Sequence, residues 1–371
     1  MDSRKTVCLN MIVRNEAHVI RRCLESARPL IDSWCIVDTG STDGTQALIR
    51  EILRDLPGQL FERPWKDFGH NRSEAITLAK GAADYLLFID ADDSFDVPPG
   101  FSMPALSADA YELVIEYGSL TYRRVSLVDN GMPWRYEGVL HEYLECDRPF
   151  RPVCLDGLRM RVGGGGGRSR IEEKEKYTRD AEILEQALRT DPGNARYAFY
   201  LAQSYRDSGQ LERSLGAYDR RAAMGGFDEE VFCSMLEAAR LSRRLGRASA
   251  EVTDRFLRAF DCRPRRAEPL GELAMYCREE GERWPLAYLF AARAIEIPQP
   301  DDALFVGYEW YAWRCLDEYA IAAYWVGEYA SSRAACERLL DNGKLPAGER
   351  ERVVGNLAFA REKLGLPPLP G

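Results

Sequence analysis

The chain has 371 residues, of which 46% are hydrophobic and 29% charged, a composition typical of a globular protein. This length exceeds one ordinary hydrophobic core, so we expect two domains. The net charge of -9 argues against a general affinity for nucleic acid or anionic membranes, and no apolar run approaches the roughly 20 residues that span a bilayer.

The N-terminal half alternates strand-like and helix-like segments. The sequence predicts strands at residues 7–13, 33–38, 58–63 and 85–89, and helices at residues 15–27, 45–53 and 71–81. This alternation predicts a mostly parallel sheet in a doubly wound α/β fold. Residues 111–128 are rich in β-forming side chains, and we expect them to pair as a hairpin.

Five consecutive glycines at residues 163–167 mark a change in the character of the chain. Because glycine-rich backbone is flexible, we interpret the stretch as a linker or mobile loop. A phosphate-binding loop is the alternative, but it would end in Lys and Ser or Thr, whereas Arg and Ser follow here. We therefore expect one domain at residues 1–162, a linker at 163–170 and a second domain at 171–371.

The C-terminal half is predicted to be all-α. The segment ARYAFYLAQSYRDSGQLERSLGAYDRRAAM, residues 195–224, resembles the tetratricopeptide repeat, with small and aromatic residues where paired helices interlock. Further helices are predicted at residues 176–188, 231–245, 249–260, 268–280, 284–295, 304–329, 331–340 and 349–364. Their divergence leaves the repeat number open. Helical repeats commonly bind peptides or proteins, so we expect this half to bind an acceptor or to mediate self-association.

The segment YLLFIDADD, residues 85–93, is a buried strand that runs directly into three carboxylates. Asp90 and Asp92 are two residues apart, so in extended chain they point to the same side. Crowded carboxylates need a compensating cation or hydrogen-bond donors. Mg²⁺ or Mn²⁺ bound together with a phosphate ligand would meet that need, whereas a simple turn or helix cap is the alternative.

Three other motifs accompany the acidic one. They are VRNEA after the first strand, VDTGSTDGT after the second, and PWKDFGHNRSEAITLA before the fourth. In this order and spacing, the four motifs resemble the family 2 glycosyltransferases with the glycosyltransferase-A fold, over roughly residues 6–145. The rival class of nucleotidyltransferases usually has a glycine-rich basic loop after the first strand, which VRNEA lacks.

The resemblance implies a nucleotide-sugar site and a metal site. The residues that it assigns to the nucleotide sugar are Val13, Arg14, Asn15, Glu16, Asp38, Arg72, Asp90, Ala91 and Asp92. Within that set, Asp38 and the first loop would hold the base, Arg72 the base or diphosphate, and Asp90 the ribose. Asp92 would bind Mn²⁺ or Mg²⁺ on the diphosphate, with Asp93 as structural support.

A late histidine is the second metal ligand that the resemblance implies. His141 lies in WRYEGVLHEYLE, some 50 residues after the acidic motif, and imidazole with carboxylate suits Mn²⁺. A core or loop histidine is the alternative. An inverting transferase also needs one general base on the acceptor, for which Glu142 and Glu137 are the candidates. Neighbours in a strand point to opposite faces, so His141 and Glu142 need not both enter the site.

The cellular setting is inferred from the cysteines and the N-terminus. Ten scattered cysteines without a CxxC pair indicate reduced thiols, and the first residues enter a strand without a secretory signal. We therefore expect a cytoplasmic protein.

The resulting hypothesis is a metal-dependent, inverting glycosyltransferase with two domains. It would move a hexose from a UDP-sugar, UDP-glucose or UDP-N-acetylglucosamine, to a peptide, protein or glycan acceptor. The layout is similar to that of bacterial peptide S-glycosyltransferases. The alternative from another class is a non-catalytic interaction protein, in which the repeats bind a partner and the nucleotide-sugar-binding domain is degenerate.

Overall fold

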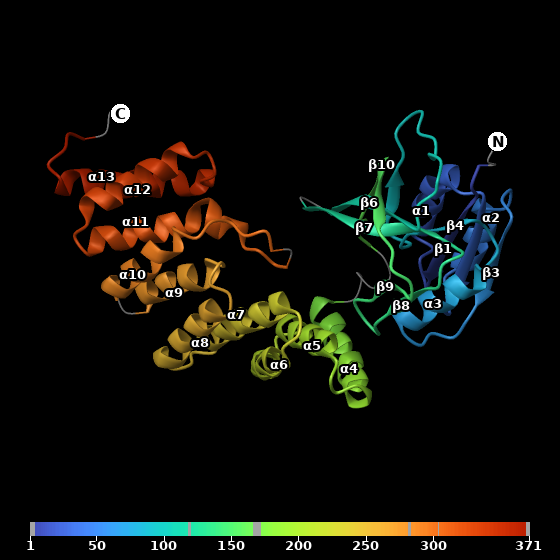
Figure 1. Ribbon diagram of the computed structural model, residues 1–371, viewed down its shortest axis with the longest axis horizontal. Coiled ribbons are helices and arrows are strands. Elements are labelled where there is room, and N and C mark those ends of the chain that lie inside the picture. Colours follow the sequence, from blue (N-terminus) through green and yellow to red (C-terminus); the bar gives the residue numbers. More distant parts are fainter. Residues whose placement is uncertain (1–3, 118–119, 166–171, 281–282, 303, 369–371) are drawn as a thin grey trace. The chain divides into compact units, whose positions relative to one another are not determined.

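A computed structural model describes residues 4–117, 120–165, 172–280, 283–302 and 304–368 (Figure 1). The chain divides into two compact units, residues 1–192 and residues 193–371. Residues 166–170 of the predicted linker lie outside the described residues. No helix in the described part of the chain is long and apolar enough to cross a membrane.

A mixed, mostly parallel sheet forms the centre of the N-terminal unit (Figure 1). Its strands are β1 (Val7–Val13), β2 (Ser33–Asp38), β3 (Gly58–Glu62), β4 (Tyr85–Phe88), β5 (Ser94–Asp96), β6 (Ala110–Tyr117), β7 (Leu120–Asp129) and β10 (Pro152–Arg161). They lie in the order β3-β2-β1-β4-β7-β6-β10-β5. The first four strands of that order are parallel, and β6 and β7 form the expected antiparallel hairpin. The α/β fold class is therefore confirmed.

Helices cover both faces of this sheet, which explains the apolar strands. Leu9 and Met11 of β1 belong to one hydrophobic core with helices α1 (Ile20–Ala27) and α2 (Thr45–Ile52). Cys8 of β1 belongs to a second core on the other face, with α3 (Phe68–Leu78). Because side chains alternate along a strand, each face of β1 has its own helical cover.

Two helices in this unit begin at positions other than the predicted ones. The first was expected from residue 15 but begins at Ile20. Asn15 has a left-handed backbone with φ 56°, and its loop is hydrogen-bonded to the loop after β2. Helix α3 begins at Phe68, before the expected residue 71, because the Asp67 carboxylate accepts the N–H of His70 at 2.7 Å.

Strands β8 (Trp134–Glu137) and β9 (Tyr143–Cys146) form a separate two-stranded antiparallel sheet. Strand β8 packs on α3, whose Ser73 hydroxyl donates to the carbonyl of Tyr136 at 3.1 Å and accepts the N–H of Tyr136 at 2.8 Å. The loop between β8 and β9 is thereby fixed beside the N-terminal half of α3.

The helical part begins with α4 (Glu173–Thr190), which belongs to the first unit. The helices of the second unit are α5 (Ala195–Asp207), α6 (Leu211–Ala223), α7 (Asp228–Arg244), α8 (Ser249–Cys262), α9 (Glu268–Glu279), α10 (Trp284–Ala294), α11 (Cys315–Trp325), α12 (Tyr329–Asp341) and α13 (Arg350–Lys363). Each packs on the next in the chain, as expected for tetratricopeptide-like repeats.

One predicted helix of this unit, at residues 304–329, is wrong at its start. A π-helical turn at Trp310–Arg314 leads into α11, and the chain at residues 304–307 is not helical. Side chains of other helices hold that chain. The N–H of Leu304 donates to Glu229 at 2.7 Å, and its carbonyl accepts from Arg266 at 3.2 Å.

Ion pairs join alternate helices of the second unit. The pairs, with nitrogen–oxygen distances of 2.8 to 3.0 Å, are Arg206–Glu237, Arg240–Glu272, Arg278–Glu318 and Arg352–Asp317. They connect α5, α7, α9, α11 and α13 in succession, so neighbouring repeats are coupled by charge as well as by apolar packing.

Asn10 provides a test of how the sheet is held to α3. This buried side chain in β1 donates from Nδ2 to the carbonyls of Cys35 at 3.2 Å and Ala75 at 2.9 Å. Asn10→Ala leaves both carbonyls without this donor, and we expect the free energy of unfolding to fall by about 1–3 kcal/mol in urea denaturation. Gln59→Ala, at an exposed β3 position, is the control and should stay within about 0.5 kcal/mol of wild type. Equal stability of the two variants would contradict this role.

Candidate functional site

Three neighbouring parallel strands end at one edge of the sheet, and the predicted site residues follow them. The register pairs Val13 of β1 with Asp38 of β2, and Asn10 of β1 with Phe88 of β4. Asp90 comes two residues after Phe88. The loop after β1 therefore lies between the second-strand aspartate and the acidic turn, at the edge where α/β folds bind ligands.

The loop after β1 is fixed to the loop after β2 by hydrogen bonds. The N–H of Asn15 donates to the Ser41 hydroxyl at 2.8 Å, and its side-chain oxygen accepts the N–H of Thr42 at 2.8 Å. The Asp43 carboxylate accepts the N–H of Ala17 at 3.0 Å. These bonds explain the left-handed Asn15 and give the edge a defined shape.

Asp38 is a buried carboxylate with one oxygen satisfied and one not. Its Oδ1 accepts the N–H groups of Gly40 at 2.9 Å and Ser41 at 2.8 Å, and the side chain of Gln46 at 3.2 Å. Its Oδ2 is buried without a hydrogen-bond partner among the described residues. A buried carboxylate oxygen without a donor is costly, so this atom is suited to accept an N–H from a ligand.

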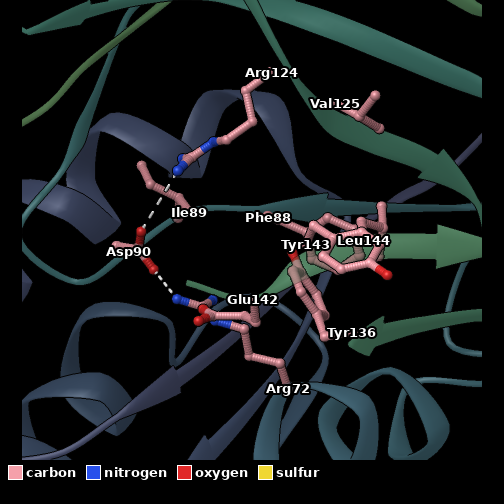
Figure 2. A pocket seen from close by; sticks show the side chains of 10 residues that line it. All are labelled: Arg72, Phe88, Ile89, Asp90, Arg124, Val125, Tyr136, Glu142, Tyr143 and Leu144. Atoms are coloured by element: carbon pink, nitrogen blue, oxygen red, sulfur yellow. Dashed lines mark hydrogen bonds and ion pairs between the residues drawn. The ribbon is translucent and has the colours of Figure 1, made fainter. Parts of the chain in front are cut away.

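An arginine from α3 joins two acidic elements of the site (Figure 2). Arg72 donates to the Asp90 carboxylate and, through Nε, to Glu142 Oε1 at 2.8 Å. Burial alone would lower the pKa of Arg72, but the charges of Asp90 and Glu142 outweigh burial and raise it. Arg72 is therefore a fixed cation in the free protein.

A second arginine, Arg124 of β7, approaches the acidic turn from the opposite side (Figure 2). Its terminal nitrogens lie 3.8 Å from Asp90 Oδ2 and 3.8 Å from Asp93 Oδ2. Burial would raise the pKa of Asp90, but Arg72 and Arg124 together lower it, so Asp90 is ionised at neutral pH.

Asp93 differs from Asp90 in its surroundings. Burial and the negative charge of Asp90 raise its pKa to about 7, although the N–H of Gly163 donates to its Oδ1 at 3.1 Å. Its side chain is buried, and its supporting role stays a prediction.

A cavity of about 310 Å³ opens beside these charges (Figure 2). It is lined by Arg72, Phe88, Ile89, Asp90, Arg124, Val125, Tyr136, Glu142, Tyr143 and Leu144. The Arg72 guanidinium lies over the Tyr136 ring, 5.5 Å from its centre. One wall is therefore charged and the other aromatic, which suits a ligand with polar groups and flat apolar faces.

The structure brings only some of the predicted residues together. Arg72, Asp90 and Glu142 line one cavity, together with Arg124 and Tyr136, which the sequence analysis did not predict. Glu137 lies outside this lining, and its carboxylate accepts from Arg135 Nε at 2.6 Å.

The remaining residues that were predicted to bind the nucleotide sugar have varied surroundings. Val13 is buried, and its carbonyl accepts the N–H of Thr39 at 2.9 Å. Arg14 is exposed, and Ala91 is buried in the hydrophobic core beneath the turn. Glu16 is half-buried, and its N–H donates to the Thr45 hydroxyl at 2.9 Å.

The two predicted metal ligands occupy turns. Asp92 is half-buried in the acidic turn, and His141 is exposed between β8 and β9 with φ 52°. Within the described ranges, no group of three or more His, Cys, Asp and Glu side chains is gathered to hold a metal. An ion there would need ligands from a bound molecule as well, and its binding by Asp92 and His141 stays a prediction.

Comparisons with known proteins agree with the two-part organisation. Residues 8–154 match the family described as glycosyl transferase family 2. A TPR repeat-containing protein of Synechococcus elongatus is 27% identical over 68% of this chain and 66% of its own length. The glycosyltransferase SunS of Bacillus subtilis is 25% identical over 53% of this chain and 49% of its own length. The chain thus spans half to two thirds of the length of these relatives.

Among solved structures, a tetratricopeptide repeat protein from Parabacteroides merdae is similar at 16% identity, with a TM-score of 0.37. The match covers 52% of this chain and 68% of that protein.

Arg72→Met tests the charge cluster in the free protein. The substitution leaves Asp90 and Glu142 without their shared cation, and we expect the free energy of unfolding at pH 7 to fall by about 2–4 kcal/mol. Arg63→Met removes a more exposed arginine, which pairs with Glu74 at 3.2 Å, and should cost less than about 1 kcal/mol. Urea denaturation measures both.

Adding Glu142→Gln to Arg72→Met provides a further check. This change removes one of the two carboxylates that lose their shared cation, so the double variant should be more stable than Arg72→Met alone. A double variant less stable than Arg72→Met would rule out the described cluster.

Proposed function

Because residues 8–154 form a domain of glycosyltransferase family 2, we propose that the chain transfers a hexose from a UDP-sugar to an acceptor, with a divalent metal and inversion at the sugar. UDP-glucose and UDP-N-acetylglucosamine are the proposed donors. The acceptor is a peptide, a protein or a glycan.

The observation that carries this proposal is the unpartnered Oδ2 of Asp38, buried where β1 and β2 end. Uracil has a ring N–H that a carboxylate oxygen can accept, so a bound uracil would satisfy this atom. The loop of Asn15 lies beside Asp38 and is held in one conformation, so part of the base site is formed before the donor binds.

The acidic turn is the proposed site for the diphosphate and its metal, next to the base. Mg²⁺ and Mn²⁺ are commonly held by one or two carboxylates plus substrate phosphates. In this arrangement we assign Asp92 and His141 as the protein ligands. A bound ion would supply positive charge that stabilises the leaving diphosphate. Asp90 is already engaged by Arg72, so we assign it to the ribose side of the donor.

Glu142 is the proposed base, in preference to Glu137, because it lines the cavity. An inverting transfer needs one group that takes the proton of the acceptor nucleophile as it attacks the sugar. Since Arg72 donates to Glu142 at 2.8 Å, that carboxylate is fixed in orientation in the free protein. The aromatic wall of Tyr136 and Tyr143 is the proposed contact for sugar or acceptor.

A thermal-shift screen of UDP, GDP and CDP sugars tests the donor. A ligand that binds only the native state raises the melting temperature, and we expect UDP-sugars with Mn²⁺ to do so most strongly. Asp38→Asn replaces the free oxygen by an amide and should remove most of this shift. A stronger response to GDP-sugars, or an unchanged shift in Asp38→Asn, would contradict the proposal.

Release of UDP tests whether the protein is an enzyme. Asp92→Ala should lower Mn²⁺-dependent UDP release at least about a hundredfold, because the metal loses a protein ligand. Asp96→Ala is the matched control. It removes an exposed carboxylate of β5, which pairs with Arg161 of β10, and should retain UDP release. A wild-type protein that binds UDP-sugar but releases no UDP with any acceptor would instead be the non-catalytic interaction protein.

A further inference from the structure

The glycine stretch is aligned with the acidic turn by the register of the sheet. Strand β5 begins directly after the turn and pairs antiparallel with β10, with Ser94 opposite Arg161. Continuing this antiparallel register two residues before Ser94 and two residues after Arg161 places Gly163 beside Asp92. The first glycines are therefore next to the proposed donor site, far from it in sequence but adjacent in the fold.

The main chain at Gly163 is in direct contact with the turn. Its N–H donates to Asp93 Oδ1 at 3.1 Å. A Cβ added at Gly163 would collide with the main-chain oxygen of Asp92 and with the terminal nitrogen of Arg22. A residue with a side chain would displace the Asp92 peptide, so only glycine fits here.

Helix α1 holds the same peptide from another direction. The Arg22 guanidinium donates to the carbonyl of Asp92. The ring of His18, in the turn before α1, hydrogen-bonds the carbonyl of Gly165. The Asp92 peptide therefore lies between a glycine on one side and an arginine that bonds its oxygen.

We propose that Gly163 and Arg22 are positioning residues of the donor site, which hold the Asp92 peptide so that its carboxylate faces the metal–diphosphate. The inference rests on the proposed function and concerns the same site. Fixing the orientation of a peptide fixes the direction of its Cα–Cβ bond, and groups that orient a metal ligand typically contribute about tenfold or more to binding. The start of the glycine stretch is thus part of the site.

Neighbouring residues provide matched controls. A Cβ at Gly164 meets nothing within 4 Å, so Gly164→Ala adds the same methyl group one residue away. Arg21 lies beside Arg22 on α1 but pairs with Glu51 at 2.9 Å on the surface, so Arg21→Ala removes the same charge without touching the turn.

The experiment measures UDP binding with Mn²⁺ by calorimetry, donor KM and kcat, and the melting temperature without ligand. We expect Gly163→Ala and Arg22→Ala to weaken UDP–Mn²⁺ binding and raise the donor KM about tenfold, with Arg22→Lys restoring part of the loss. Gly164→Ala and Arg21→Ala should stay within about twofold of wild type. Arg22→Ala, which adds no collision, should keep the ligand-free melting temperature.

The outcomes separate this inference from the proposed function. If wild type binds no UDP-sugar, the proposed function fails. If wild type binds UDP with Mn²⁺ while Gly163→Ala and Arg22→Ala bind as tightly as their controls, the positioning role is overturned and the donor assignment stands. Weaker binding by Arg22→Ala at an unchanged melting temperature supports the role even where Gly163→Ala lowers stability.

Discussion

The compensation of two carboxylates, Asp90 and Asp93, in a partly buried turn is the constraint on which the N-terminal unit depends. Asp90 and Asp93 cannot both be ionised there without nearby cations. The sheet supplies Arg124 from β7, and α3 supplies Arg72, which also binds Glu142 of the β8–β9 loop. One electrostatic requirement thus brings a helix, a strand and a loop to the acidic turn, and the cavity opens beside it.

The strands around this point could be predicted because each is buried on both faces and so reads as an apolar run, as in β1, β2 and β4. Strands β5, β8 and β9 have three or four residues and mixed polarity, so their existence depends on pairing partners far along the chain. Asp38, Arg72 and Asp90 were found through motif order. Arg124 was missed because its role follows from the antiparallel register of β7 beside β4 and not from its neighbours in sequence.

In the second unit, helix positions follow from apolar spacing, whereas the connections between repeats do not. The ion-paired residues are 31 to 40 residues apart, close to the roughly 34 residues of a tetratricopeptide repeat. Equivalent faces of successive repeats therefore carry complementary charges. A chain segment that departs from this period, such as the one before the π-helical turn at Trp310–Arg314, is held by side chains of other helices and escapes prediction from local pattern.

Because β10 passes directly into the glycines, the main sheet ends before the proposed donor site does. A fragment ending at Val162 would retain every strand of the sheet, yet it would lack the glycine whose N–H binds Asp93. A graft of the main sheet onto another helical partner should therefore include residues 163–165. An evolutionary exchange of the helical part would be under the same restriction, because the proposed site extends beyond the last strand of the sheet.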